Sequence, residues 1–236
     1  MTTDSRELAK HPKGRATASM VWNGDGIQRV ILVSNRGPVD HHFDEDEMPI
    51  AQRGAGGVVS GLVSAVGQRP TTWIALAMND ADRAVARARG KATIPNAPEL
   101  ANIALRLVDV PAATYERYYE GISNRILWFA QHYLLRPTGS ARFSDRTRRD
   151  WDTGYRVVNE AIAEAVIEEL QANGASTPVL FQDYHLYLAP ALVRAACPEA
   201  MLEHFVHIPW PESRYWEMLP DDMVREIRAA MAESGR

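Results

Sequence analysis

Five short, mostly apolar runs constrain the fold of this chain more than any other feature of its sequence. Runs rich in apolar residues at successive positions are typical of strands that a parallel sheet buries on both faces. Each run ends in a turn-like or polar segment. The runs span residues 29–34, 72–78, 103–108, 178–182 and 201–207.

Helical patterns lie between these runs. An apolar stripe with steps of three and four residues predicts a long helix, and its members are Trp151, Tyr155, Val158, Ile162, Val166 and Leu170. Gly174 supplies a stop for it. We expect further helices over 58–66 and 188–196, and one that Asp221 or Asp222 caps after Pro220. Strands that alternate with helices predict an α/β fold with a doubly wound, Rossmann-like parallel sheet.

Composition narrows the class of protein. At 236 residues and 46 % hydrophobic composition the chain can bury one substantial core. A net charge of −4 without a basic stripe argues against a nucleic-acid partner. The single cysteine, Cys197, excludes an internal disulfide and favours a reducing compartment. With no apolar run of membrane-spanning length and no secretory core, we expect a cytoplasmic protein without a membrane partner.

The expected domain organisation is a flexible leader over residues 1–26, which are polar and without periodicity, followed by one domain over residues 27–236.

Ligands of doubly wound sheets bind at the carboxyl ends of the strands. After the first run, Arg36 offers a permanently charged fork suited to a phosphate. Gly57 ends a glycine-rich stretch and begins a helix, where backbone N–H groups can approach an anion. The alternative is a tight turn in which Arg36 pairs with Asp40 or Asp44.

Asp183 and His185 follow the fourth run, and His207 ends the fifth beside an X-Pro turn. Asp183 and His185 can hydrogen-bond sugar hydroxyls or manage a proton. The alternatives are a helix cap with a core histidine and, for His207, a structural histidine.

A segment dense in aromatic residues, 118–128, includes Tyr119 and Trp128. Aromatic faces commonly stack on sugar rings. An aromatic core cluster would give the same sequence pattern and is the alternative. The acidic run 44–47 is expected to be a solvated loop, and the neighbouring His41-His42 pair is not expected to bind metal.

Six motifs in chain order resemble those of the trehalose-6-phosphate synthases, glycosyltransferase family 20. They are Ser34-Asn-Arg-Gly-Pro, Gly56-Gly57, Tyr119 with Ser123-Asn-x-x-Leu-Trp128, Trp151-x-x-x-Tyr155-x-x-Val-Asn159, Asp183-Tyr-His-Leu and His207-Ile-Pro-Trp-Pro. The resemblance covers residues 29 to 228, nearly the whole chain.

The resemblance implies the N-terminal, acceptor-side half of a GT-B type enzyme with two Rossmann-like domains. Such enzymes transfer glucose with retention from a nucleotide-glucose to glucose 6-phosphate, without a metal or cofactor. By analogy, Arg36 binds the acceptor phosphate, and Tyr119, Trp128 and Asp183 hold its sugar. Gly57 and His207 contact the donor, and Asp183 and His207 are the catalytic candidates.

Departures from the family pattern leave the exact acceptor open. Where the family commonly has Trp-x-Gly-Trp, this chain has Trp73-Ile-Ala-Leu, and Phe129 follows Trp128 in place of proline. A glucosylglycerol-phosphate type synthase, with another phosphorylated polyol as acceptor, could share the pattern.

The donor-binding domain has no counterpart in this chain, so the sequence does not choose among UDP-, GDP- and ADP-glucose. We therefore expect an incomplete enzyme with little activity alone, working with a separate donor-domain chain or as a homo-oligomer. A non-catalytic sugar-phosphate-binding module is the main alternative. A Rossmann oxidoreductase is disfavoured, because Gly54-Ala-Gly-Gly57 is misplaced for the dinucleotide fingerprint.

Overall fold

The computed structural model describes residues 28–54, 57–88, 92–93, 98–135 and 143–234. The leader expected over residues 1–26 lies outside this part, as do Ala55 and Gly56 of the glycine-rich stretch.

One sheet of six strands organises the molecule, in the order β5-β6-β4-β1-β7-β8. All pairs are parallel except that of β5 with β6. The five predicted runs are therefore confirmed as parallel strands of one sheet. The strands are β1 (Val30–Val33), β4 (Thr71–Leu76), β5 (Ala92–Thr93), β6 (Ile103–Val108), β7 (Val179–Gln182) and β8 (Leu202–Phe205).

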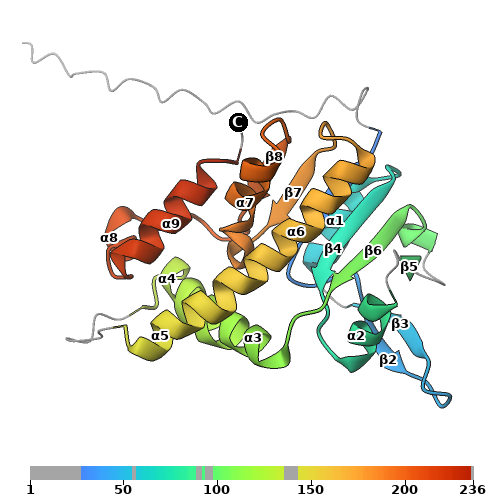
Figure 1. The fold of residues 1–236 in the computed structure, drawn as a ribbon, viewed down its shortest axis with the longest axis horizontal. Helices are drawn as coiled ribbons and strands as arrows, with labels where there is room; N and C mark the ends of the chain where they lie inside the picture. The colour runs from blue at the N-terminus through green and yellow to red at the C-terminus, as the bar shows by residue number, and fades with distance from the viewer. Residues whose placement is uncertain (1–27, 55–56, 89–91, 94–97, 136–142, 235–236) are drawn as a thin grey trace, which may run out of the picture.

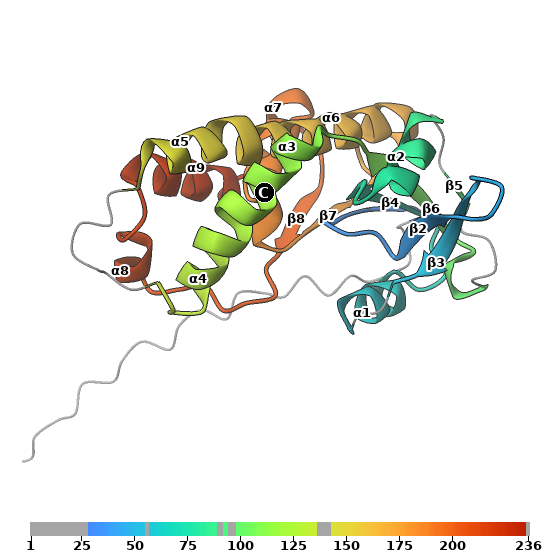
Figure 2. The same ribbon diagram turned by 90° about the horizontal axis from the view of Figure 1, so that it is seen from below.

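Helices cover both faces of the sheet, which confirms the doubly wound α/β fold. Helices α6 (Arg156–Asn173) and α7 (Ala189–Ala196) lie on one face, and α1 (Gly57–Val66) lies on the opposite face (Figures 1 and 2). Alternate residues of β1 enter two separate cores: Ile31 and Val33 pack on the α6 side, and Val30 and Leu32 pack on the α1 side. Burial on both faces explains why the strands read as continuous apolar runs.

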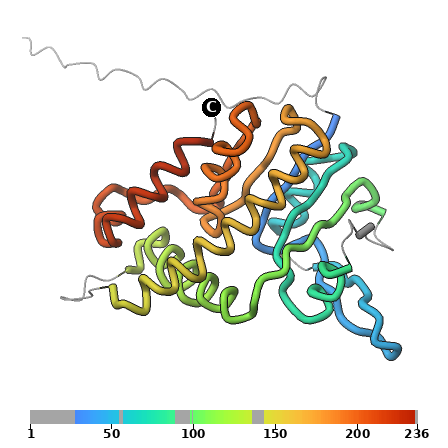
Figure 3. The backbone as a smooth tube through the Cα atoms, in the orientation of Figure 1, coloured from blue at the N-terminus to red at the C-terminus, as the bar shows by residue number. Residues whose placement is uncertain are grey.

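A helical layer lies beside the carboxyl ends of the strands, as the chain path in Figure 3 shows. It contains two π-helical segments, η2 (Arg117–Leu127) and η3 (Trp151–Tyr155), which pack against each other at Gly154 of η3. A Cβ on Gly154 would come within 2.6 Å of the Arg117 Cβ, so only glycine permits this approach. The layer also contains α3 (Ala112–Glu116), α4 (Trp128–Gln131) and α5 (Asp145–Asp150).

The remaining helices of the described ranges are α2 (Asp80–Arg87), η1 (Pro98–Leu100), η4 (Tyr184–Leu186), α8 (Ser213–Trp216) and α9 (Asp221–Met231). No helix within the described ranges is long and apolar enough to cross a membrane.

Three expectations about local structure have different outcomes. Gly174 ends α6 with φ of 99°, as predicted. The apolar stripe begins in a π-helical turn, η3, before α6 continues it. The prediction that Asp221 or Asp222 caps α9 is wrong: Pro220 holds the cap position without a side-chain bond, and Asp222 pairs with Arg148.

A hairpin that the sequence did not predict follows β1, with strands β2 (Val39–Phe43) and β3 (Pro49–Arg53). Its exposed turn covers residues 44–47, which confirms the solvated loop predicted for the acidic run. The two-stranded hairpin lies outside the main sheet and alternates buried with exposed positions on β2.

A buried histidine–carboxylate pair anchors this hairpin to α2. The Asp82 carboxylate accepts hydrogen bonds from the His41 backbone N–H (3.1 Å), the His41 Nδ1 (2.7 Å) and the Met78 backbone N–H (2.9 Å). Burial raises the pKa of the Asp82 carboxyl, but these hydrogen bonds outweigh it, and the pKa lies below its ordinary value. His41 therefore has a structural partner.

We expect Asp82→Asn to lower the free energy of unfolding at pH 7 by about 2 kcal/mol, because a buried, charge-assisted network is broken. Since the folded pKa is depressed, the carboxylate contributes fully above its unfolded pKa of about 3.9. That contribution disappears as the pH falls through the folded pKa. Urea unfolding of both proteins between pH 7 and pH 3 measures the difference and its convergence at low pH.

Asp80→Asn is the matched control. Asp80 lies on the same helix, but its ion pair with Arg83 is exposed and should contribute less than about 0.5 kcal/mol. Equal losses in the two variants would show that the His41–Asp82 pair does not anchor the hairpin.

Candidate substrate-binding site

The carboxyl ends of β1 and β7, the segment after β8 and the start of α1 surround a hollow of about 270 Å³. Five of the six predicted site residues line it: Arg36, Gly57, Tyr119, Asp183 and His207. They come from segments that are far apart in the sequence. The structure thus brings these residues together, and their individual roles remain predictions.

Hydrogen bonds from two core side chains hold the turn after β1. Trp73 Nε1 donates to Ser34 Oγ (2.7 Å), and Ser34 Oγ donates to the Arg36 carbonyl (2.6 Å). Asn35 Oδ1 accepts from the buried Tyr118 hydroxyl (2.9 Å). These bonds fix the backbone from which Arg36 projects.

The Arg36 guanidinium has no hydrogen bond or ion pair with any residue in the described ranges, and the side chain is exposed. The alternative pairing of Arg36 with Asp40 or Asp44 is therefore absent from this part of the chain. A guanidinium at the edge of a hollow without a carboxylate partner is available to an anionic ligand.

Gly57 opens α1, and its backbone faces unoccupied space. A Cβ placed there would meet no described atom within 4 Å. Packing within the described residues thus does not require glycine at this position. A ligand that approaches the first N–H groups of the ten-residue helix would require it.

Asp183 has an unusual backbone conformation, with φ of 68° and ψ of 171°. This region is adopted almost only by glycine and costs other residues about 1–3 kcal/mol. The Asp183 carboxylate accepts from the Tyr184 backbone N–H (2.9 Å) and caps η4. The helix-cap alternative is therefore correct for the local structure, while Asp183 also lines the hollow.

Burial shifts the pKa values of two groups that line the hollow, Asp183 and His185. Burial raises the pKa of the Asp183 carboxyl, partly opposed by the Tyr184 N–H and by His207. Burial also lowers the pKa of His185 to about 3, so its imidazole is neutral at physiological pH. His185 stacks on Tyr184 (4.1 Å between ring centroids) and on Tyr119 (5.8 Å).

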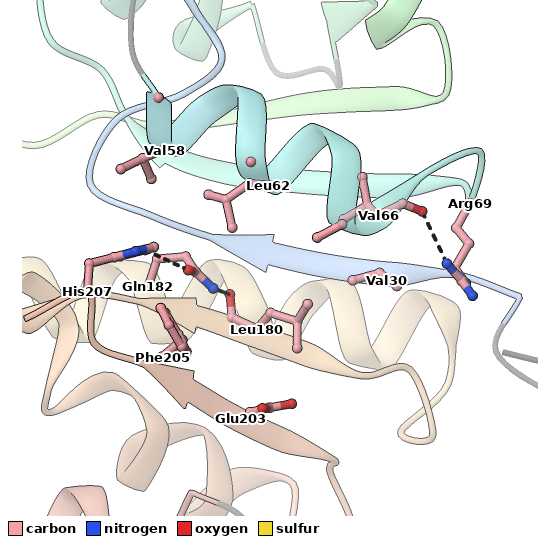
Figure 4. A pocket seen from close by; sticks show the side chains of 13 residues that line it. Val30, Val58, Leu62, Val66, Arg69, Leu180, Gln182, Glu203, Phe205 and His207 are labelled. Carbon is pink, nitrogen blue, oxygen red and sulfur yellow. Dashed lines mark hydrogen bonds between the residues drawn. The ribbon is translucent and has the colours of Figure 1, made fainter. Parts of the chain in front are cut away.

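His207 follows the end of β8 by two residues and lines the same hollow. Its Nε2 is 3.1 Å from Gln182 Oε1, at the end of the neighbouring strand. Figure 4 shows this pair at one end of an apolar groove of about 600 Å³ between α1 and strands β7 and β8. Val58, Leu62 and Phe205 line the groove. Gly57 and His207 line both hollows, so the two are adjacent.

Trp128 is the sixth predicted site residue, and it is not among the residues that line the hollow. Its indole lies 4.0 Å from the His132 ring and 5.0 Å from Phe129, and it packs against the main core. The core-cluster alternative therefore describes Trp128 and the fully buried Tyr118, whereas Tyr119 reaches the hollow.

Sequence reasoning assigned no role in the site to Trp73 and Gln182, and it left His185 undecided. All three line the hollow. Strand alternation places Gln182 on the same face as Leu180 and could have indicated it. Trp73 was named only for the family pattern, and its position within a buried strand does not indicate that it lines the hollow. Among the described residues no cluster of three or more metal-ligating side chains is found.

The fold and the strand-end site define the class: a Rossmann-like α/β domain with a candidate ligand site at the carboxyl ends of its parallel strands. The model of glycosyltransferase family 20 matches residues 28–232. The trehalose-6-phosphate synthases of Mycobacterium sp. (strain JLS) and Mycolicibacterium smegmatis are 31 % and 30 % identical in sequence to this chain. These alignments cover 84 % and 83 % of this chain, but only 36 % and 35 % of the relatives.

Solved structures agree in fold. A trehalose-phosphate synthase from Burkholderia multivorans superposes with a TM-score of 0.64 at 22 % identity, over 88 % of this chain and 38 % of that one. An Escherichia coli structure bound with UDP-2-fluoro glucose superposes with a TM-score of 0.63 at 22 % sequence identity, over 87 % of this chain and 38 % of that one. The chain belongs to glycosyltransferase family 20 and spans little more than a third of the length of these relatives.

We expect Asp183→Gly to raise the free energy of unfolding by about 1 kcal/mol, because relief of backbone strain exceeds the loss of the η4 cap. Urea unfolding measures the change. Glu47→Gly is a matched control: Glu47 also has positive φ (58°) but lies in the exposed hairpin turn. A loss of stability in Asp183→Gly would show that its conformation is not strained.

Proposed function

We propose that this chain is the acceptor-binding part of a retaining glucosyltransferase that forms trehalose 6-phosphate from a nucleotide-glucose and glucose 6-phosphate. Residues 27–236 would form the acceptor-side domain. The observation that carries the proposal is the Arg36 guanidinium, which has no partner among the described residues and lies beside the hollow that Tyr119 and Asp183 line. Membership of family 20 and the names of the curated relatives support it.

In this proposal the two ends of the acceptor are recognised by different chemistry. Arg36 binds the phosphate as a permanent cation. The Tyr119 ring and the neutral His185 offer an apolar face and a polar edge to the sugar ring. The Asp183 carboxylate accepts a hydrogen bond from a sugar hydroxyl and so fixes the orientation of the ring.

The donor would lie on the side of Gly57 and His207. The open backbone at the start of α1 suits the diphosphate, whose developing charge the helix N-terminus stabilises. His207, oriented by Gln182, would contact the donor glucose. The chain's contribution to rate would be positioning, with the acceptor hydroxyl attacking from the face that the diphosphate leaves.

The donor nucleotide and the compartment are part of the proposal. A similar structure is bound with UDP-2-fluoro glucose, and another, from Burkholderia xenovorans, is in complex with glucose 6-phosphate. UDP-glucose is therefore the first donor to test. Phosphorylated substrates together with a single cysteine favour a cytoplasmic location.

A second acceptor class has support from one observation. Trp128 does not line the hollow, and Leu76, where the family commonly has a second indole, is fully buried. Neither aromatic position of the family pattern contributes to the hollow, and a smaller phosphorylated polyol such as glycerol 3-phosphate would use the same phosphate anchor.

Titration calorimetry of the chain with glucose 6-phosphate, glycerol 3-phosphate and inorganic phosphate tests the proposal. We expect glucose 6-phosphate to bind most tightly, and Arg36→Ala to weaken it at least about tenfold through loss of a charge-assisted hydrogen bond. Arg36→Lys should retain part of the affinity, because it keeps the charge but not the fork.

Arg125→Ala is the matched control, since Arg125 is an exposed arginine of η2 that does not line the hollow. Tighter binding of glycerol 3-phosphate would favour the second acceptor class. Glucose 6-phosphate binding that survives Arg36→Ala unchanged would contradict the assigned phosphate site.

A further inference from the structure

The strained backbone of Asp183 must be held by its neighbours. Two hydrogen bonds reach its peptide groups from β8. The Asp183 N–H donates to the Phe205 carbonyl (2.7 Å), and the Asp183 carbonyl oxygen is 2.8 Å from His204 Nε2. The first continues the sheet ladder, whereas the second comes from a side chain and requires an N–H donor at position 204.

The chemistry of this contact fixes the tautomer of His204. A carbonyl oxygen only accepts, so Nε2 must carry the proton and donate it. Nδ1 is sealed from solvent and has no partner within the described residues. Burial lowers the pKa of His204 to about 4, although the bond to Asp183 opposes the shift, so the ring is neutral at physiological pH.

The position of His204 follows from strand alternation. Glu203 and Phe205 face the groove beneath α1, and His204 points to the opposite face. In the parallel register His204 pairs with Phe181, two residues before Asp183. Its ring lies 6.0 Å from Phe181 and 5.6 Å from Tyr187, which keeps Nε2 directed at the end of β7.

We propose that His204 is a positioning residue: its Nε2–H holds the Asp183 carbonyl and thereby keeps the Asp183 carboxylate facing the sugar-phosphate hollow. The ligand part of this inference rests on the proposed function. A residue that only filled space between Phe181 and Tyr187 could be replaced by phenylalanine without consequence for Asp183.

Two substitutions separate the effect of the His204 N–H, a hydrogen-bond donor, from the effect of its aromatic ring. His204→Phe keeps an aromatic ring and removes the N–H, whereas His204→Gln can return an N–H to the same carbonyl. We expect His204→Phe to weaken glucose 6-phosphate binding about tenfold and His204→Gln to restore it to within about threefold of the original. Leu202→Ala, on the same strand and face, is the control for a general loss of stability and should leave affinity unchanged.

A double substitution tests whether His204 acts through Asp183. Asp183→Gly removes the carboxylate and the strain, while Arg36 still anchors the phosphate. In that background His204→Phe should change affinity less than about twofold. An equal effect of His204→Phe in both backgrounds would overturn the proposal.

Nuclear magnetic resonance of the ligand-free chain gives a test that does not depend on the proposed function. Long-range nitrogen–proton correlations should show His204 protonated at Nε2, and His204→Phe should shift the backbone resonances of Asp183 whereas Leu202→Ala should not. A proton on Nδ1, or unchanged Asp183 resonances, would overturn the proposal. If the unaltered chain binds no sugar phosphate, the proposed function fails while this spectrum still decides the role of His204.

Discussion

The parallel register of β1, β7 and β8 is the constraint on which the candidate site depends. Val33 pairs with Phe181, and Phe181 pairs with His204, so the three strands end at one level. The segments after them consequently meet around a single hollow. A shift of one residue in either pair would exchange the two faces of a strand and displace Arg36, Asp183 and His207 relative to one another.

Core packing and site geometry are linked by a small number of hydrogen bonds. Trp73, fully buried in the α1-side core, reaches Ser34 in the turn that carries Arg36. Tyr118, fully buried in the α6-side core, reaches Asn35 in the same turn. Both cores therefore support one loop, which explains how an exposed arginine can keep a defined position.

At Asp183, by contrast, the site contains a backbone conformation that lowers stability. Its backbone conformation is unfavourable for a residue with a Cβ, and yet an aspartate stands there and lines the hollow. Strain of this kind persists only where the surroundings impose it, and it concentrates at functional sites. The bonds from Phe205, His204 and Tyr184 supply that constraint.

The sequence predicted the strands and the long helix well, because apolar periodicity records burial directly. It failed for the β2–β3 hairpin, since a strand such as Val39–Phe43 carries three polar residues and pairs outside the main sheet. The prediction that Asp221 or Asp222 caps α9 was wrong because Asp222 pairs with Arg148, a contact that the local sequence pattern does not reveal.

Prediction of the site had the same limits. Position after a strand and side-chain chemistry predicted that Arg36 and Asp183 would lie at the hollow, and they line it, while their roles stay predictions. Trp128 was assigned to the sugar because an indole in a polar, aromatic segment suits sugar binding. It lies outside the hollow beside His132, a placement that local pattern does not reveal, and its role also stays a prediction. The partner of Asp183, His204, lies within a strand, where only the three-dimensional register makes it visible.

A crystal structure of the chain grown with glucose 6-phosphate would show whether the strand-end hollow is the acceptor site. We expect the phosphate within hydrogen-bonding distance of the Arg36 guanidinium, and the sugar between Tyr119 and Asp183. A ligand bound instead in the groove between α1 and β7, or away from the strand ends, would contradict this assignment.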